Sequence, residues 1–178
     1  MYRAKSIYLI GVAVVLGARP VQAQSAPTDY RNEFLEHFER STRKIMSLAD
    51  AMPEELYTWS PGKGIMSIAQ VYMHIARYNF YYPETALGID APADIDVPNL
   101  ESITAKARVT GLLRRSVEHV RMHVSGMTEE ELTNPTRLYG RQIAGWAVLL
   151  QLLAHMNEHV GQSVAYARMN GIVPPWSM

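Results

Sequence analysis

Apolar residues recur at helical spacing along most of the chain after residue 29. The first periodic segment is followed by Pro53 and carries apolar residues at Phe34, Phe38, Ile45, Leu48 and Met52. The second begins at the capping box Ser67–Gln70, in which the two side chains satisfy each other's free amide groups. Its apolar stripe runs through Val71, Ile75, Tyr78 and Tyr82, with Pro83 at or near its end. The pattern predicts two helices separated by a turn.

The second half of the chain predicts two further helices. Residues 86–99 combine prolines and aspartates without a sustained period, so we expect a loop there. A third helix is predicted from Leu100 to Ser125, and residues 126–141 read as an irregular connection with one helical turn after the capping box Thr128–Glu131. The last helix is predicted from Gln142 or Ile143 to Met169, where Asn170-Gly171 supplies a left-handed exit. Strand-like alternation is weak, so we expect an all-α four-helix bundle.

The first residues have the pattern of a secretory signal peptide. Arg3 and Lys5 precede the apolar run from Ile7 to Ala18, and Val21-Gln22-Ala23 resembles a cleavage site. We therefore expect a signal peptide at 1–23, a linker at 24–29 and one bundle domain at 30–175. The protein would then be exported, to the periplasm or the extracellular space. An uncleaved anchor is the alternative, although the apolar run is shorter than the roughly 20 residues of a membrane-spanning helix.

Composition excludes several kinds of function. Without Arg3, Lys5 and Arg19, the remaining chain has 14 basic residues against 17 acidic ones, which does not suit a nucleic-acid-binding protein. The arginines at 108, 114, 115 and 121 are interpreted as a solvated helix face. The chain has no cysteine, which rules out disulfides, thiolate ligands and covalent c-type haem. Any bound metal must therefore be held by nitrogen and oxygen atoms.

Two histidines stand four residues apart in the last predicted helix. His155 and His159 lie together beside the main stripe, which passes through Trp146, Leu149, Leu153, Met156, Val160 and Val164. One turn of helix brings both rings to one side, where they can approach one ion. His74 in the second helix is a third candidate ligand. The alternative is a pair of structural histidines satisfied by tyrosine hydroxyls, carbonyls or water.

These residues resemble a known family. The run 51–79 with His74, and the run 140–175 with His155, His159 and Gly161-Gln162, are similar to the DinB-like superfamily of bundle proteins. The resemblance implies that the three histidines bind a divalent metal, commonly nickel or zinc. It also implies hydrolase or thiol-dependent transferase chemistry in some members, and a homodimer as a frequent state. Relatives commonly have histidine where this chain has Glu158, so an acid/base role does not transfer.

Other interpretations of the same segments stay open. The sequence His155-Met156-Asn157-Glu158-His159 also fits the H-x-x-E-H peptidase pattern, but no acidic residue follows His159 to serve as a further ligand. Non-covalent haem is a further alternative. His119 and His123 are interpreted as a pair near the end of a helix, where a cationic ring is favourable. His37 is expected at the surface.

We therefore expect an exported bundle that binds one metal ion through His74, His155 and His159. Gln162, Asn79 and Tyr78 are candidates to orient these ligands, and Glu158 is the candidate proton acceptor. The expected activity is that of a metal-dependent hydrolase acting on an unidentified small molecule, with thiol-dependent transfer less favoured in an exported protein. The alternative is a non-catalytic metal-binding or stress-related sequestering protein.

Overall fold

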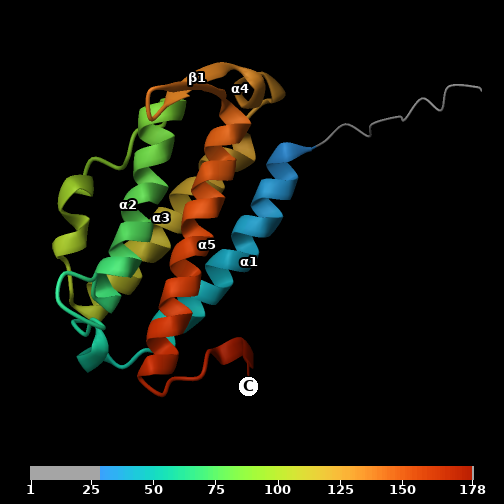
Figure 1. Ribbon diagram of the computed structural model, residues 1–178. Coiled ribbons are helices and arrows are strands. Elements are labelled where there is room, and N and C mark those ends of the chain that lie inside the picture. Colours follow the sequence, from blue (N-terminus) through green and yellow to red (C-terminus); the bar gives the residue numbers. More distant parts are fainter. Residues whose placement is uncertain (1–28, 178) are drawn as a thin grey trace, which may run out of the picture.

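Four long helices dominate the structure, a computed structural model that describes residues 29–177 (Figure 1). They are α1 (Tyr30–Ala51), α2 (Ile68–Leu87), α3 (Lys106–Gly126) and α5 (Gly145–Met169). The short helix α4 (Glu129–Thr133) and the 3₁₀ helices η1 (Glu54–Leu56), η2 (Val97–Ser102) and η3 (Pro175–Ser177) lie between or after them. The predicted all-α bundle is confirmed. The predicted signal peptide, and all but Asp29 of the predicted linker, lie outside the described residues.

The four helices enclose one apolar core. Helix α2 packs against α3 and α5, and α1 packs against the same two helices. The side chains of Phe38, Ile45, Phe80, Leu113 and Met156 are almost completely buried between them. Both predicted capping boxes are present, at Ser67–Gln70 and Thr128–Glu131, and they fix where α2 and α4 begin. Among the described residues, no helix is both long and apolar enough to span a membrane.

The connection between α2 and α3 differs from the prediction. Residues 97–102 form η2, and α3 begins at Lys106 rather than at Leu100. Local bonds from Asn99 to Asp96 and from Ser102 to the Asn99 carbonyl favour tight turns, and an extended backbone at Ile103 then separates η2 from α3. Figure 1 shows this connection running back along the outside of α2. As a result, η2 packs against the side of α2.

The sequence did not predict a small hairpin before α5. Strands β1 (Pro135–Leu138) and β2 (Arg141–Ala144) pair antiparallel within the segment predicted as irregular. The turn residues Tyr139 and Gly140 have φ angles of 51° and 75°, as a tight two-residue hairpin turn requires. Asn-Gly is the usual sequence for such a turn, so Tyr139-Gly140 gave little signal. Because β2 occupies residues 141–144, α5 begins at Gly145 instead of Gln142 or Ile143.

Two helix details also differ from the prediction. Helix α2 continues one turn beyond Pro83 to Leu87 and ends at Gly88, which has a left-handed conformation. In α5, Leu149, Met156 and Val160 are buried as predicted, whereas Trp146, Leu153 and Val164 are only partly buried. The fully buried face instead includes Val148, Leu152 and Ser163, because α5 packs against both α1 and α2. This face is rotated toward the side that carries the histidines.

Candidate metal centre

The packing of α2 against α5 brings three histidines together. His74 comes from the second turn of α2, and His155 and His159 come from adjacent turns of α5. One ring nitrogen from each residue lies within 4.8 Å of one from each of the others. The ring centroids are 5.0 Å apart for His74–His155, 4.8 Å for His74–His159 and 4.6 Å for His155–His159. The rings therefore surround one point between the two helices.

The spacing of these nitrogens fits a divalent metal ion. Zinc–nitrogen bonds are about 2.0–2.1 Å long, so two nitrogens on a tetrahedral ion are separated by about 3.4 Å. The nitrogens lie within 4.8 Å of one another, which is close to that separation. Three neutral imidazoles form the protein part of a site that leaves a coordination position free. The residues present therefore fit the metal that the sequence predicted.

Two of the three rings are held by hydrogen bonds through Nδ1. His74 Nδ1 lies 2.8 Å from Glu101 Oε1, and His159 Nδ1 lies 2.8 Å from Gln162 Oε1. An ionised carboxylate or an amide oxygen only accepts hydrogen bonds, so each Nδ1 carries a proton and donates it. In a neutral ring the proton-free nitrogen is then Nε2, which is the atom available to a metal. Such partners fix both the tautomer and the orientation of a metal-binding histidine.

His155 differs from the other two histidines in the surroundings of its ring nitrogen. Its Nε2 is buried and has no hydrogen-bond partner among the described residues. Burial lowers the pKa of His155 to about 3, with further contributions from His159 and His74. Burial also lowers the pKa of His159. Neutral rings are required for metal binding, and a buried nitrogen without a partner is costly unless something binds it. The lowered pKa values keep the rings neutral. A metal ion at this position would give His155 Nε2 the partner that it lacks within residues 29–177.

Glu101 is a site residue that sequence reasoning missed. It belongs to η2, and its Oε1 accepts hydrogen bonds from His74 Nδ1 at 2.8 Å and from Arg77 Nη1 at 3.0 Å. Burial acts to raise the pKa of Glu101, but the bonds from His74 and Arg77 outweigh it, so the pKa is lowered. Glu101 therefore stays ionised and orients His74. No sequence signal identified it, because the residue is 27 positions from His74 in a segment predicted as a helix start.

Gln162 lies where the sequence predicted a partner for the histidines. Its side-chain oxygen accepts the bond from His159, and its Nε2 donates to the Tyr166 hydroxyl at 2.8 Å. Tyr166 is buried and packs edge-on against Trp59, with ring centroids 5.5 Å apart. The amide therefore cannot flip without losing both bonds. This chain of contacts holds the His159 ring in place.

Tyrosine rings form the other boundary of the histidine cluster. Tyr78 packs 4.3 Å from His155 and 4.7 Å from His74, measured between ring centroids. Tyr82 lies edge-on to His155 at 5.8 Å, and its hydroxyl lies 2.7 Å from the hydroxyl of Tyr139 in the hairpin turn. Burial raises the pKa of Tyr78 and of Tyr82, so both hydroxyls remain protonated. The hairpin thus places Tyr139 next to the aromatic boundary of the site.

The remaining predicted site residues lie elsewhere. The Asn79 side chain is buried and donates to Ser116 Oγ at 3.0 Å, so it faces α3 and not the histidines. Glu158 is exposed on α5, next in sequence to His159. His37 is exposed on α1, as expected. Of the candidates other than the three ligands, the structure brings only Gln162 and Tyr78 into contact with a histidine of the cluster.

The pair His119 and His123 is not the charged helix end that the sequence suggested. His119 is only 5% exposed, and its Nε2 has no partner among the described residues. Burial lowers its pKa to about 4, with a contribution from His123, so the ring is neutral near pH 7. The ring packs against Phe80 with centroids 5.1 Å apart. The sequence-based expectation of a cationic pair is therefore wrong for His119, because α3 turns this residue toward α2.

The fold and the histidine cluster together define a four-helix-bundle protein with a candidate metal centre between two helices. The family model of the DinB superfamily matches residues 37–167. That range is well over half of the chain and contains all three histidines. The chain belongs to the DinB superfamily.

Solved structures support the same fold. A DinB-like protein from Bacillus cereus superposes with a TM-score of 0.68 at 20% sequence identity, covering 81% of this chain and 95% of that one. A DinB-like protein from Bacillus subtilis gives 0.64 at 19% identity, covering 80% and 94%. A conserved protein from Enterococcus faecalis gives 0.59 at 16% identity, covering 77% and 94%. Comparison with curated proteins gives no match.

Proposed function

We propose that this protein binds one divalent metal ion, nickel or zinc, through His74, His155 and His159. The observation that carries the proposal is the convergence of three ring nitrogens to within 4.8 Å of one another. Two of the rings have Nδ1 held by Glu101 and Gln162, and the third has a buried Nε2 with no partner among the described residues. Each observation on its own has a structural explanation. Together they describe a preorganised set of three neutral nitrogen ligands.

We further propose that the protein is an exported hydrolase that acts on a small molecule. A bound divalent ion with a free coordination position polarises a substrate oxygen or lowers the pKa of water toward neutrality. The chain contributes by fixing the ligands: Glu101 orients His74, and Gln162 orients His159. Tyr78 and Tyr82 limit the space beside His155. Glu158, exposed on α5 and next in sequence to His159, is the proposed proton acceptor.

The first experiment measures bound metal. The purified protein, a variant with His74, His155 and His159 all changed to alanine, and the control variant His37→Ala are each loaded with nickel, zinc, manganese and iron and then desalted. We expect about one equivalent of metal in the wild type and in the control, and none in the triple variant. Circular dichroism checks that the triple variant remains helical. Equal, negligible metal in all three proteins contradicts the proposal and makes the histidines structural.

The second experiment tests catalysis with the metal that the first one identifies. The loaded protein and the triple variant are compared on panels of esters, amides and phosphoesters. Turnover by the wild type alone supports a hydrolase, and Glu158→Gln should then reduce kcat if Glu158 accepts the proton. Metal binding without turnover on any panel favours a non-catalytic metal-binding protein. Export is tested separately, by finding the N-terminus of the protein recovered from a secreting host: we expect it to begin at Gln24.

A further inference from the structure

A row of tyrosine rings leads from the histidine cluster to the turn of the hairpin. This tyrosine row consists of Tyr78, Tyr82 and Tyr139. Tyr78 contacts His155 with ring centroids 4.3 Å apart, and Tyr82 packs against Tyr78 at 5.0 Å. Tyr139 contacts Tyr82 edge-on, with centroids 6.0 Å apart and the two hydroxyls at 2.7 Å. The tip of the hairpin is thus joined to the candidate metal centre by consecutive ring contacts.

Tyr139 occupies a backbone position that does not favour tyrosine. Its φ of 51° is left-handed, a conformation in which the Cβ approaches the following carbonyl oxygen, so such turns prefer asparagine, aspartate or glycine. The side chain is 60% exposed and therefore adds little to the apolar core. A strained backbone that carries an exposed aromatic side chain is typical of a residue retained for recognition and not for stability.

The hairpin holds this exposed ring in a fixed position relative to α2. Strands β1 and β2 pair antiparallel, and the Thr136 hydroxyl donates to the Ala86 carbonyl on α2. At the base of the hairpin, the Gly145 amide donates to the Asn134 carbonyl at 3.1 Å. Because α2 also carries His74, the same helix places the ring and one of the metal ligands. A ring that is already ordered binds a ligand without the entropy cost of ordering it.

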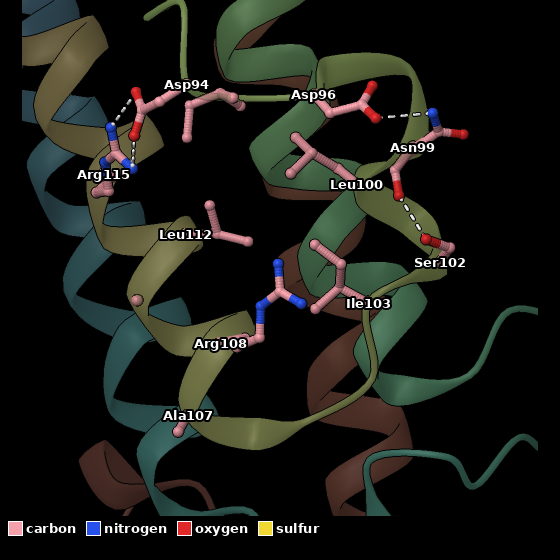
Figure 2. A pocket seen from close by; sticks show the side chains of 12 residues that line it. Asp94, Asp96, Asn99, Leu100, Ser102, Ile103, Ala107, Arg108, Leu112 and Arg115 are labelled. Carbon is pink, nitrogen blue, oxygen red and sulfur yellow. Dashed lines mark hydrogen bonds and ion pairs between the residues drawn. The ribbon is translucent and has the colours of Figure 1, made fainter.

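Two polar side chains in contact with the histidines are already engaged by them. Glu101 on η2 accepts the bond from His74, and Gln162 on α5 accepts the bond from His159. A cavity of about 720 Å³ lies between η2 and α3, and no histidine is among the residues that line it (Figure 2). A molecule bound at the metal therefore finds a flat, uncharged surface along the tyrosine row.

We propose that Tyr139 is a specificity-determining residue whose ring packs against an aromatic group of the molecule bound at the metal. This role rests on the proposed metal centre, because the metal holds an oxygen of that molecule while its ring lies along the tyrosine row. Aromatic pairs in offset or edge-on contact stabilise a complex beyond the area that they bury. Tyr139 keeps most of its side chain exposed for such a contact. The substrate class is a small molecule with an aromatic ring next to the oxygen that binds the metal.

The test compares two metal-binding probes, acetohydroxamate and benzohydroxamate, which share their oxygen donors and differ in a methyl or a phenyl group. Calorimetric titration of the metal-loaded protein gives the ratio of their two Kd values. In Tyr139→Asn we expect the preference for benzohydroxamate to fall by about three- to tenfold, with the Kd for acetohydroxamate unchanged. Asparagine suits this turn, so the variant is expected to keep the hairpin.

Two control variants separate the ring from other effects. Tyr139→Phe keeps the ring without the hydroxyl and should retain the wild-type preference. Trp176→Asn removes an exposed aromatic side chain near the C-terminus and should also leave the preference unchanged. Elemental analysis and circular dichroism confirm for each protein that the metal is bound and that the bundle is folded.

Three results would overturn the role of Tyr139 and leave the metal centre standing. An unchanged preference in Tyr139→Asn, with a full equivalent of metal bound, excludes contact with the ring. A stronger preference in that variant means that Tyr139 keeps aromatic groups out. Loss of the preference in Tyr139→Phe assigns it to the hydroxyl and not to the ring. If the wild type binds no metal, the elemental analysis overturns the proposed function, and the role of Tyr139 fails with it.

Discussion

The removal of Glu101 tests whether a residue outside the metal ligands controls metal affinity. In Glu101→Ala, His74 loses the acceptor that lies 2.8 Å from its Nδ1, and Arg77 loses the carboxylate 3.0 Å from its guanidinium. The His74 ring is then free to rotate and to place its proton on either nitrogen. Loss of such a partner typically reduces metal affinity by about 10- to 100-fold. That change corresponds to roughly 1.4–2.7 kcal/mol of binding free energy.

The assay is competition for metal with a chelating dye at constant pH and ionic strength. We expect the Kd to rise within that range for Glu101→Ala, and to rise less for Glu101→Gln, because the glutamine oxygen still accepts from Nδ1. The matched control is Glu84→Gln, which changes an exposed glutamate on α2 and should leave the Kd unchanged. Wild-type affinity in Glu101→Ala refutes the argument that Glu101 positions His74. If the wild type itself binds no metal, the proposed centre fails before this test applies.

Two further predictions concern stability. His119 has a pKa of about 4 in the folded protein against 6.5 in the unfolded chain, so the unfolded chain binds more protons between these values and stability falls as pH decreases through that window. Urea unfolding should show that, between pH 7.5 and pH 5, the free energy of unfolding falls by about 2 kcal/mol more in the wild type than in His119→Leu. Equal decreases in the two proteins refute a neutral buried ring. In Gly145→Ala, the new Cβ lies 2.3 Å from the Glu131 carbonyl oxygen, so we expect destabilisation of about 1–3 kcal/mol. The control Gly161→Ala, in the same helix with open space around it, should be neutral or stabilising by up to about 1 kcal/mol in the same urea titration.

Local patterns were sufficient for the parts of this protein that depend on neighbouring residues. The apolar period predicted the helical class, Ser67–Gln70 and Thr128–Glu131 predicted two helix starts, and Asn170-Gly171 predicted the end of α5. The four-residue spacing of His155 and His159 predicted that their rings share one side of a helix. These features were readable because each depends on backbone periodicity or on bonds spanning three or four residues.

Only the tertiary structure decided which distant residues meet. Glu101 reaches His74 because the connection after α2 returns along the outside of that helix, and no periodic signal encodes that path. His119 is buried against Phe80 rather than charged at a helix end, because the rotation of α3 is set by its packing on α2 and α1. The hairpin that carries Tyr139 also lacked a local signal. The amino-acid sequence by itself therefore determined the helices and the spacing of the ligands. Long-range packing determined which partners orient and bury those ligands, because contacts between helices depend on the path of the connections and on the rotation of each helix about its axis.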